Sequence, residues 1–220
     1  MTIDVWQIDL RGPESAFQLD WLDVGERARL QAYEPPTVKL RFARSHAALR
    51  GILAGYADRP PAALRLAAGS HGKPVLLGES LHFNLAHSGH LALLAVSPEV
   101  AVGVDVEEVR PLRNLLEMAH TVFHAEEIRE LQVLSPREQQ EAFFECWVRR
   151  EAFVKGLGMG LAAPRSVGPA WRPGSPVTRP CNGWEVQGLD TQQPYRAAVA
   201  AETFGFQVRS QRWPPTAVTE

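Results

Sequence analysis

Cysteine, lysine and long apolar runs are scarce in this sequence. Cys146 and Cys181 are the only cysteines among 220 residues, so neither a disulfide framework nor a cysteine-based zinc site is expected. The longest apolar run, residues 91–96, is far too short to span a bilayer. Residues 1–10 carry acidic side chains where a signal peptide needs a basic end and an apolar run. These absences favour a cytoplasmic enzyme or binding protein that does not insert into a membrane.

The charge balance gives no sign of a polyanionic partner. The formal net charge is −2, with 45% hydrophobic and 22% charged residues. This balance is typical of a soluble globular protein without bulk affinity for nucleic acid or anionic membranes. Arginine supplies most of the positive charge, and the lysines are Lys39, Lys73 and Lys155 alone. A lysine in this background is a candidate for a position that needs a compact point charge, although codon bias would give the same imbalance.

Hydrophobic periodicity predicts a mixed α and β fold. Expected strands lie at residues 2–10, within 71–97, and at 101–109, 184–189, 195–202 and 204–213; expected helices lie at residues 21–33, 37–57, within 110–134, and at 135–158. The order of strand, helix and strands occurs twice. We therefore expect an N-terminal half over residues 1–100, a C-terminal half over residues 101–212, and a tail at 213–220.

The segment AVGVDVEEV at residues 101–109 reads as a buried strand that carries acids. Because side chains alternate along a strand, Asp105 and Glu107 share one face, opposite the valines. Two carboxylates this close repel each other unless a cation lies between them. Mg²⁺ takes one or two carboxylates together with phosphate and water, so the pair predicts a metal site. An amphipathic strand with a solvated acidic face explains the pattern equally.

The helix pattern CWVRREAFVKGLG supplies a third carboxylate. Trp147, Glu151 and Lys155 lie four residues apart and therefore line one stripe of the helix. Glu151 and Lys155 stand just before a glycine-rich helix end, which favours a functional position. The alternative is an exposed ion pair of the usual i, i+4 type.

Two further segments offer groups that bind phosphate. Lys73 lies in a tight turn, and Asn84, His87 and Ser88 follow near the end of a short strand. Such loops hold phosphate oxygens through side chains and backbone N–H groups, although two polar β-turns would look the same. The helix at residues 37–57 adds three cations that form either a phosphate clamp or a solvated helix face: Arg41, Arg44 and Arg50.

Taken together, these segments resemble the 4′-phosphopantetheinyl transferases of the Sfp type. Two signatures of that family stand here as VGVDVE at residues 102–107 and WVRREAFVK at residues 147–155. Upstream GKP and FNLAHS segments match in order and spacing, so the motifs cover residues 40–161. The sequence departs from the family pattern at Ala86, where the family often has serine, and at Arg150, where lysine is commoner.

The resemblance implies a fold and a set of site residues. Such enzymes have two similar α/β halves in a pseudo-twofold arrangement, with coenzyme A and Mg²⁺ in the cleft between them. The implied Mg²⁺ ligands are Asp105, Glu107 and Glu151, and the implied catalytic residues are Asp105, Glu151 and Lys155. The implied coenzyme A ligands are Arg44, Lys73, His87, Ser88 and Lys155. Glu127 matches a further acidic position of the family, with Glu126 as the alternative match.

The implied activity is transfer of the phosphopantetheine arm of coenzyme A to a serine of an acyl or peptidyl carrier protein. The reaction depends on Mg²⁺, with Mn²⁺ as the alternative, and releases adenosine 3′,5′-bisphosphate. Glu151, Glu127 or a metal-bound water takes the serine proton. The pathway stays open among fatty-acid, polyketide and nonribosomal-peptide synthesis, and a monomer is favoured. The competing interpretations are a Mg²⁺-dependent phosphoesterase and a non-catalytic module that binds coenzyme A or a carrier protein.

Overall fold

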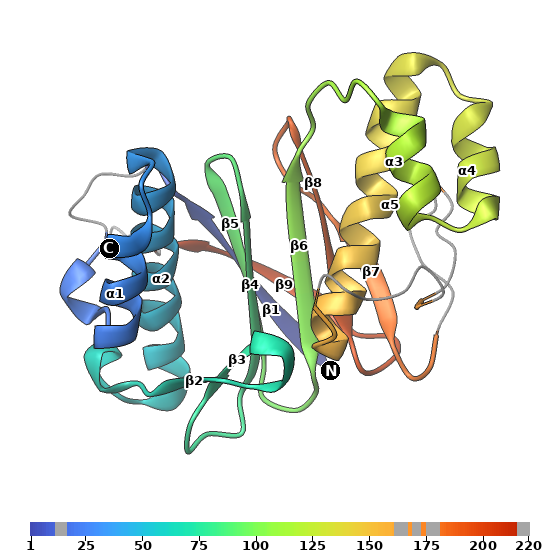
Figure 1. Ribbon diagram of the computed structural model, residues 1–220. Coiled ribbons are helices and arrows are strands. Elements are labelled where there is room, and N and C mark those ends of the chain that lie inside the picture. The colour runs from blue at the N-terminus through green and yellow to red at the C-terminus, as the bar shows by residue number, and fades with distance from the viewer. Residues whose placement is uncertain (12–16, 161–166, 169–172, 175–180, 215–220) are drawn as a thin grey trace, which may run out of the picture.

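The protein folds into two main β-sheets between two layers of helices, with a small two-stranded sheet in addition (Figure 1). The computed structural model describes residues 1–11, 17–160, 167–168, 173–174 and 181–214. The helices are α1 (Val24–Ala32), α2 (Pro36–Ala57), α3 (Leu115–Val122), α4 (Ala125–Gln132) and α5 (Pro136–Leu157). The strands are β1 (Thr2–Asp9), β2 (Leu66–Ala68), β3 (Pro74–Leu76), β4 (His82–Ser88), β5 (Leu91–Ser97), β6 (Val102–Glu108), β7 (Glu185–Leu189), β8 (Tyr195–Ala201) and β9 (Gln207–Trp213). The expected mixed α and β fold is confirmed.

The first sheet has the strand order β4-β5-β1-β9. β5 runs antiparallel to both β4 and β1, whereas β9 runs parallel to β1. The last strand of the chain therefore completes the sheet that the first strand began. The expected division placed residues 204–212 in the second half and Trp213 in the tail, whereas β9 pairs with β1 of the first half. The expected tail at 213–220 lies outside the described residues from 215 onward.

The second sheet has the order β6-β8-β7 and is antiparallel throughout. β6 and β4 are edge strands of their respective sheets, and the two edges lie side by side (Figure 1). The Val104 N–H donates to Oδ1 of Asn84 across this seam, at 2.8 Å. A buried side-chain acceptor thus satisfies a backbone donor that no strand of the same sheet reaches. The seam joins the two halves of the molecule through polar contacts.

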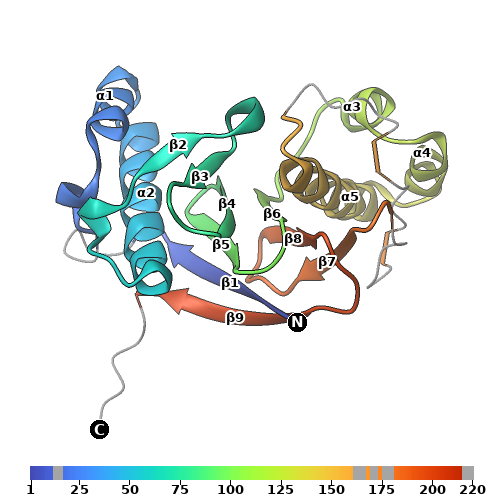
Figure 2. The same ribbon diagram turned by 90° about the horizontal axis from the view of Figure 1, so that it is seen from below.

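Figure 2 shows the layers of helices and strands from below, and three hydrophobic clusters pack these layers together. One packs α2 against the outer face of the first sheet, and another packs α3, α4 and α5 against the second sheet. The third lies between the sheets and includes Val102, Val104 and Val106. Because side chains alternate along β6, its other face, with Asp105 and Glu107, points toward α5.

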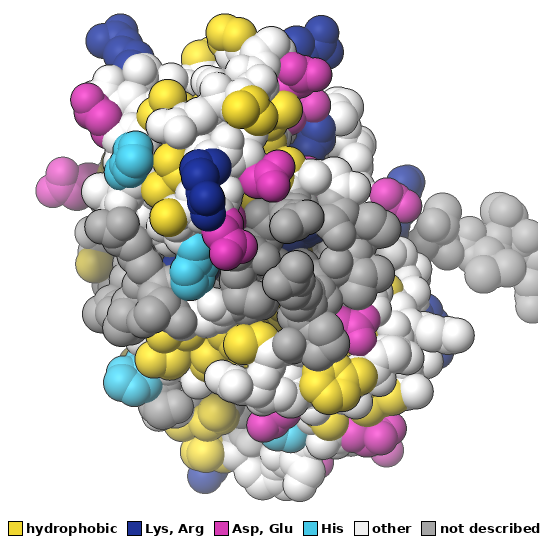
Figure 3. All heavy atoms as spheres, turned by 90° about the vertical axis from the view of Figure 1, so that its right-hand side faces the viewer, with side chains coloured by type: hydrophobic (Ala, Val, Ile, Leu, Met, Phe, Trp, Pro, Cys, Tyr) yellow, Lys and Arg dark blue, Asp and Glu magenta, His cyan; other side chains and the backbone are white. Residues whose placement is uncertain are grey.

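Helix α5 has the ends that its sequence predicts. Ser135 and Glu138 form a reciprocal capping box, with Pro136 at the first helical position. The helix stops at Gly158, whose φ of 69° is a left-handed conformation that glycine adopts without strain. On the face of the molecule that carries α3 and α4, acidic, basic and hydrophobic side chains are interspersed (Figure 3). In the described part of the chain, none of the helices is long and apolar enough to cross a membrane.

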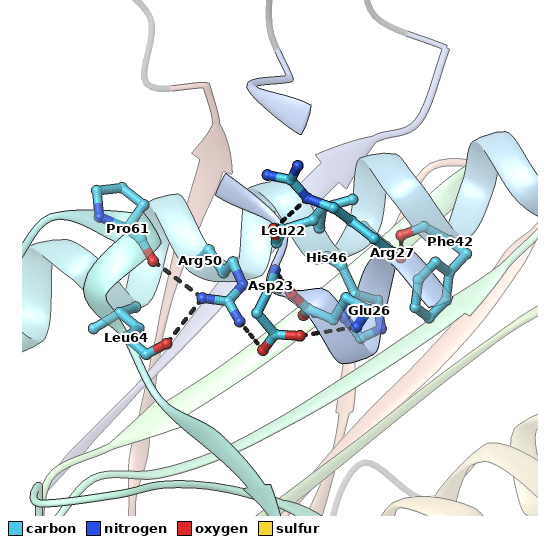
Figure 4. A network of polar contacts seen from close by, with 10 residues as sticks. Leu22, Asp23, Glu26, Arg27, Phe42, His46, Arg50, Pro61 and Leu64 are labelled. Atoms are coloured by element: carbon cyan, nitrogen blue, oxygen red, sulfur yellow. Dashed lines mark hydrogen bonds and ion pairs between the residues drawn. The ribbon is translucent and has the colours of Figure 1, made fainter. Parts of the chain in front are cut away.

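A buried ionic network ties α1 to α2 (Figure 4). The Arg50 guanidinium is fully buried and donates to Glu26 Oε2 at 2.6 Å, to Asp23, and to the carbonyl oxygens of Pro61 and Leu64. The second carboxylate oxygen of Glu26 lies 2.8 Å from His46 Nδ1. Arg50 is therefore fully engaged inside the protein, and the expected phosphate-clamp role does not apply to it.

Glu26→Gln should lower the free energy of unfolding by about 3 kcal/mol, because it leaves buried Arg50 without one of its two charged partners. Burial alone raises the pKa of Glu26, but the bonds from His46, the Asp23 N–H and Arg50 outweigh burial and hold this pKa below its ordinary value. The stability lost in Glu26→Gln should therefore have its full size at pH values above the ordinary glutamate pKa of about 4.3. It should shrink as the pH falls through the lower pKa that Glu26 has in the folded protein. Urea denaturation across this pH range measures it.

Glu138→Gln is the matched control, because Glu138 holds the same capping-box position in α5 but is exposed and carries no buried arginine. Its free energy of unfolding should stay close to that of the wild type. Equal losses in the two variants would show that the capping bonds, rather than the Arg50 pair, carry the effect.

Candidate functional site

Two glycines let α5 lie directly on β6. A Cβ atom at Gly103 would stand 2.0 Å from the Ala152 carbonyl oxygen and 2.3 Å from the Gly156 nitrogen, far inside van der Waals contact. A Cβ atom at Gly156 would stand 2.4 Å from the Trp184 ring. Helix and strand can therefore approach this closely only because Gly103 has no side chain, while the bare Gly156 leaves room for the Trp184 ring. The approach brings the last turn of α5 over the carboxylate face of β6.

Asp105 and Lys155 meet at this contact. Lys155 Nζ lies 2.5 Å from Asp105 Oδ1, and Asp105 is only 3% exposed. Its other oxygen, Oδ2, is buried and has no hydrogen-bond partner among the described residues. Burial raises the pKa of Asp105 to about 7, with Lys155 opposing the shift and Glu107 and Glu151 adding to it. A buried acceptor without a partner is costly and rare, which makes this carboxylate a candidate functional group.

Glu107 and Glu151 complete a group of three carboxylates that repel one another. Burial raises the pKa of Glu151, and the neighbouring charge of Glu107 raises it further. Both glutamates also raise the pKa of Asp105, so the three carboxylates lie close to one another. Within the described residues, no three acidic, histidine or cysteine side chains are arranged as a ready metal site. Here Lys155 holds one oxygen of Asp105, and Ser88 holds one oxygen of Glu107.

The donor set nevertheless fits a hard divalent cation. All three side chains offer carboxylate oxygens, which Mg²⁺ prefers. The partnerless Asp105 Oδ2 and the mutual repulsion of the three groups would both be relieved by a positive charge between them. The fit of this group to a divalent cation rests on the oxygen donors and on the repulsion among the three carboxylates.

A group of cations lies next to the carboxylates. Partial burial lowers the pKa of His87, and the charges of Lys155, His46 and Arg41 lower it further. These side chains come from β4, α5 and α2, so both halves of the molecule contribute positive charge to one region. His46 was not expected from the sequence, where it is an isolated histidine in an apolar helix. Only the tertiary structure reveals the position of His46, because the Glu26 carboxylate of α1 holds its ring in place.

Arg44 does not join this group. Its Nη1 donates to the Leu10 carbonyl oxygen at 2.5 Å, and its guanidinium lies 5.3 Å from the centre of the Phe17 ring. The expectation that Arg44 contacts phosphate disagrees with this placement, since the side chain turns toward the end of β1. Arg41, one turn earlier on the same helix, acts electrostatically on His87. Helical periodicity alone could not choose between the two arginines.

Lys73 and Ser88 make contacts across the seam between the halves. Lys73 Nζ donates to the carbonyl oxygens of Val102 and Gly156 at 2.8 and 2.9 Å, and burial lowers its pKa to about 8. Ser88 Oγ donates to Glu107 Oε2 at 2.8 Å. Both residues were expected to bind coenzyme A, but in this structure their polar atoms hold the second half of the protein.

Glu127 lies at the start of α4 and shares the neighbouring Arg150 with Glu151, because both charges raise the pKa of this guanidinium. It is 2% exposed, and its Oε2 accepts the His124 N–H at the start of α4, at 2.7 Å. Its charge acts on Arg150, whose pKa burial lowers and Glu127 raises. Glu127 is not among the charges that shift Asp105 or Glu151. Its geometry is that of a buried capping residue that supports α5.

Comparison with known proteins decides the family. The family model for the 4′-phosphopantetheinyl transferase superfamily matches residues 101–217. The chain is also 34% identical over 212 residues to the 4′-phosphopantetheinyl transferase HetI of Nostoc sp., covering 93% of this chain and 90% of that protein. The chain belongs to the 4′-phosphopantetheinyl transferase superfamily. The resemblance drawn from the sequence motifs is confirmed.

Other members of the superfamily match over shorter stretches. The 4′-phosphopantetheinyl transferase psf-1 of Bacillus pumilus is 43% identical over 94 residues, which is 42% of this chain and 39% of that protein. The transferase AcpT of Salmonella typhimurium is 42% identical over 91 residues, which is 41% of this chain and 47% of that protein. Membership supports an enzyme that transfers phosphopantetheine from coenzyme A to carrier proteins.

Asp105→Asn should raise the free energy of unfolding at pH 8 in EDTA by at least about 1 kcal/mol. Asp105 has a folded-state pKa near 7, above the ordinary aspartate value of about 3.9, so ionisation destabilises the folded protein. The wild type should therefore lose stability as the pH rises from about 4 to 7, and the neutral variant should not. Denaturation at pH 4 and pH 8 measures the gap, which should close at the lower pH.

Asp4→Asn is the matched control in a buried β1 position. Burial raises the pKa of Asp4, but hydrogen bonds from Arg209 and Tyr56 outweigh burial and keep the pKa low. This substitution should therefore destabilise the protein at pH 8. If Asp105→Asn also destabilised the protein at pH 8, the ionised Asp105 carboxylate would not be a destabilising group in the folded protein.

Proposed function

We propose that the protein transfers the 4′-phosphopantetheine group of coenzyme A to a serine hydroxyl of an apo acyl or peptidyl carrier protein, in a Mg²⁺-dependent reaction. The observation that carries this proposal is the adjacency of two oppositely charged groups. The carboxylates of Asp105, Glu107 and Glu151 lie close together beside Lys155, and Arg41 and His46 of α2 act electrostatically on the neighbouring His87 of β4, as Lys155 also does. Three carboxylates suit a divalent cation, and the neighbouring cations suit phosphate oxygens.

The reaction is a phosphoryl transfer at the pyrophosphate of coenzyme A. The serine oxygen forms a bond to the phosphorus that carries the pantetheine arm, and the bond from this phosphorus to the bridging oxygen breaks. Adenosine 3′,5′-bisphosphate leaves with that oxygen, and the serine proton passes to a base. Charge neutralisation and positioning supply most of the catalysis in such reactions.

Lys155 and Glu151 have the placement for two of these tasks. The Lys155 side chain is 32% exposed, contacts the buried Asp105 carboxylate and acts electrostatically on His87, so it can offset charge that develops on the leaving phosphate. Burial raises the pKa of Glu151, which brings this carboxylate closer to the operating pH of a general base. Glu127 is occupied in its helix cap and does not suit this role.

Asp105, Glu107 and Glu151 would hold Mg²⁺ or Mn²⁺. A bound divalent cation would supply charge to the pyrophosphate oxygens and orient them. In the protein itself, the close contact of α5 with β6 holds the carboxylates at a fixed separation before substrate arrives. Every residue of the proposed site comes from one chain, which supports a monomer.

Incubation of the protein with coenzyme A, Mg²⁺ and an apo carrier protein should add one phosphopantetheine mass to the carrier, as measured by intact-protein mass spectrometry. Asp105→Ala should abolish the gain, because it removes the buried carboxylate of the site. Glu138→Gln, which alters an exposed capping residue, should leave the gain intact. Hydrolysis of simple phosphate esters without any gain on several carriers would favour a phosphoesterase instead, and coenzyme A binding with neither activity would favour a non-catalytic module.

Arg41→Ala should weaken coenzyme A binding about tenfold, which is the usual size of one lost charge-assisted hydrogen bond. Arg44→Ala should leave this affinity unchanged, because Arg44 is bonded to the Leu10 carbonyl oxygen away from the cation group. Isothermal titration calorimetry with coenzyme A measures both. A larger loss in Arg44→Ala than in Arg41→Ala would restore Arg44 as the phosphate ligand.

A further inference from the structure

The Ser88 hydroxyl joins the two halves of the protein at the acidic group. Ser88 is the last residue of β4, in the first sheet. Its Oγ donates to Glu107 Oε2 at 2.8 Å and accepts the Glu108 N–H at 3.1 Å. Both partners belong to β6, the edge strand of the second sheet. One hydroxyl thus fixes both a carboxylate of the proposed metal group and the backbone next to it.

The turn after Ser88 is held against the second sheet by independent contacts. Gly89 has a φ of 55°, and a Cβ there would lie 2.3 Å from Glu108 Oε2 and 2.6 Å from the Tyr195 hydroxyl oxygen. The His90 N–H donates to the same Tyr195 hydroxyl at 3.0 Å. The turn is therefore docked on β6 and β8 without any contribution from the Ser88 side chain. Loss of the Ser88 hydroxyl should leave this docking in place.

The hydroxyl has a single hydrogen, and Glu107 takes it. A serine hydroxyl donates one hydrogen bond and accepts two. With the proton directed at Glu107 and one lone pair taken by the Glu108 N–H, Ser88 has no donor left for a phosphate oxygen. The bond to Glu107 Oε2 fixes the carboxylate through one oxygen and does not use Oε1. To bind a phosphate of coenzyme A, Ser88 would have to direct its hydroxyl hydrogen at a phosphate oxygen instead of at Glu107.

We propose that Ser88 is a positioning residue for divalent-cation binding, which holds Glu107 in its ligating orientation and does not contact coenzyme A. The proposal rests on the proposed function, because it assumes that Glu107 binds the cation. Groups that hydrogen-bond to a metal-ligating carboxylate fix its orientation, and their loss lowers metal affinity. Since His87 precedes Ser88 on the same strand, β4 would place one residue near the phosphate groups and the next on a cation ligand.

The test separates cation affinity from coenzyme A affinity. Electron paramagnetic resonance titration with Mn²⁺ in the presence of coenzyme A measures the first, and calorimetry with coenzyme A in EDTA measures the second. Ser88→Ala should weaken Mn²⁺ binding about tenfold, the lower end of the effect of losing such a supporting bond. Its coenzyme A affinity in EDTA should equal that of the wild type. Ser88→Thr keeps the hydroxyl and should restore Mn²⁺ binding.

Ser97→Ala is the matched control. Ser97 ends β5, is fully buried, and its hydroxyl accepts the Glu99 and Val100 N–H groups far from Glu107. It should lower stability without changing Mn²⁺ affinity. Unchanged Mn²⁺ affinity in Ser88→Ala, an equal loss in Ser97→Ala, or weaker coenzyme A binding in EDTA would each overturn the proposal. If the wild type transfers phosphopantetheine but Ser88→Ala binds Mn²⁺ normally, only this proposal fails; if the wild type neither transfers nor binds Mn²⁺, the proposed function fails with it.

Discussion

The close packing of α5 on β6 determines most of the site. Gly103 lets helix and strand approach until a single Cβ atom would collide with the backbone of α5, and Gly156 leaves room for the Trp184 ring beside this contact. At this distance the last turn of α5 places Lys155 on Asp105 and brings Glu151 near Glu107. The glycine of the VGVDVE motif is therefore as much a requirement of the site as its two acids are. A charged group with a raised pKa persists here because the surrounding packing enforces its position.

The seam between the two sheet edges explains why several polar residues of the first half do not point freely at a ligand. Edge strands carry backbone groups that need partners. Asn84 meets this need at Val104 and Ser88 meets it at Glu108, while Lys73 binds carbonyl oxygens at the start of β6 and the end of α5. Asn84, Ser88 and Lys73, which precede β6 in the sequence, thus join the two halves of the protein.

The fold class, the extent of α5 and the four-residue stripe of Glu151 and Lys155 could be predicted from the sequence, because each depends on local periodicity and capping. The shared face of Asp105 and Glu107 also followed from strand alternation. The choice of Arg41 over Arg44, the part played by His46, and the partners of Lys73 and Ser88 could not be predicted. Each depends on which element packs nearby, and the pairing of β9 with β1 joins residues from opposite ends of the chain.

That pairing of β9 with β1 also constrains how the protein can be made. During synthesis, β1 leaves the ribosome about two hundred residues before its parallel neighbour β9. Until then one edge of β1 is open, and buried Asp4 lacks its Arg209 partner. Contacts between such distant segments slow folding and leave an unpaired strand edge exposed to other chains. The N-terminal half is consequently a poor candidate for an independent folding unit, and its completion has to wait for nearly the whole chain.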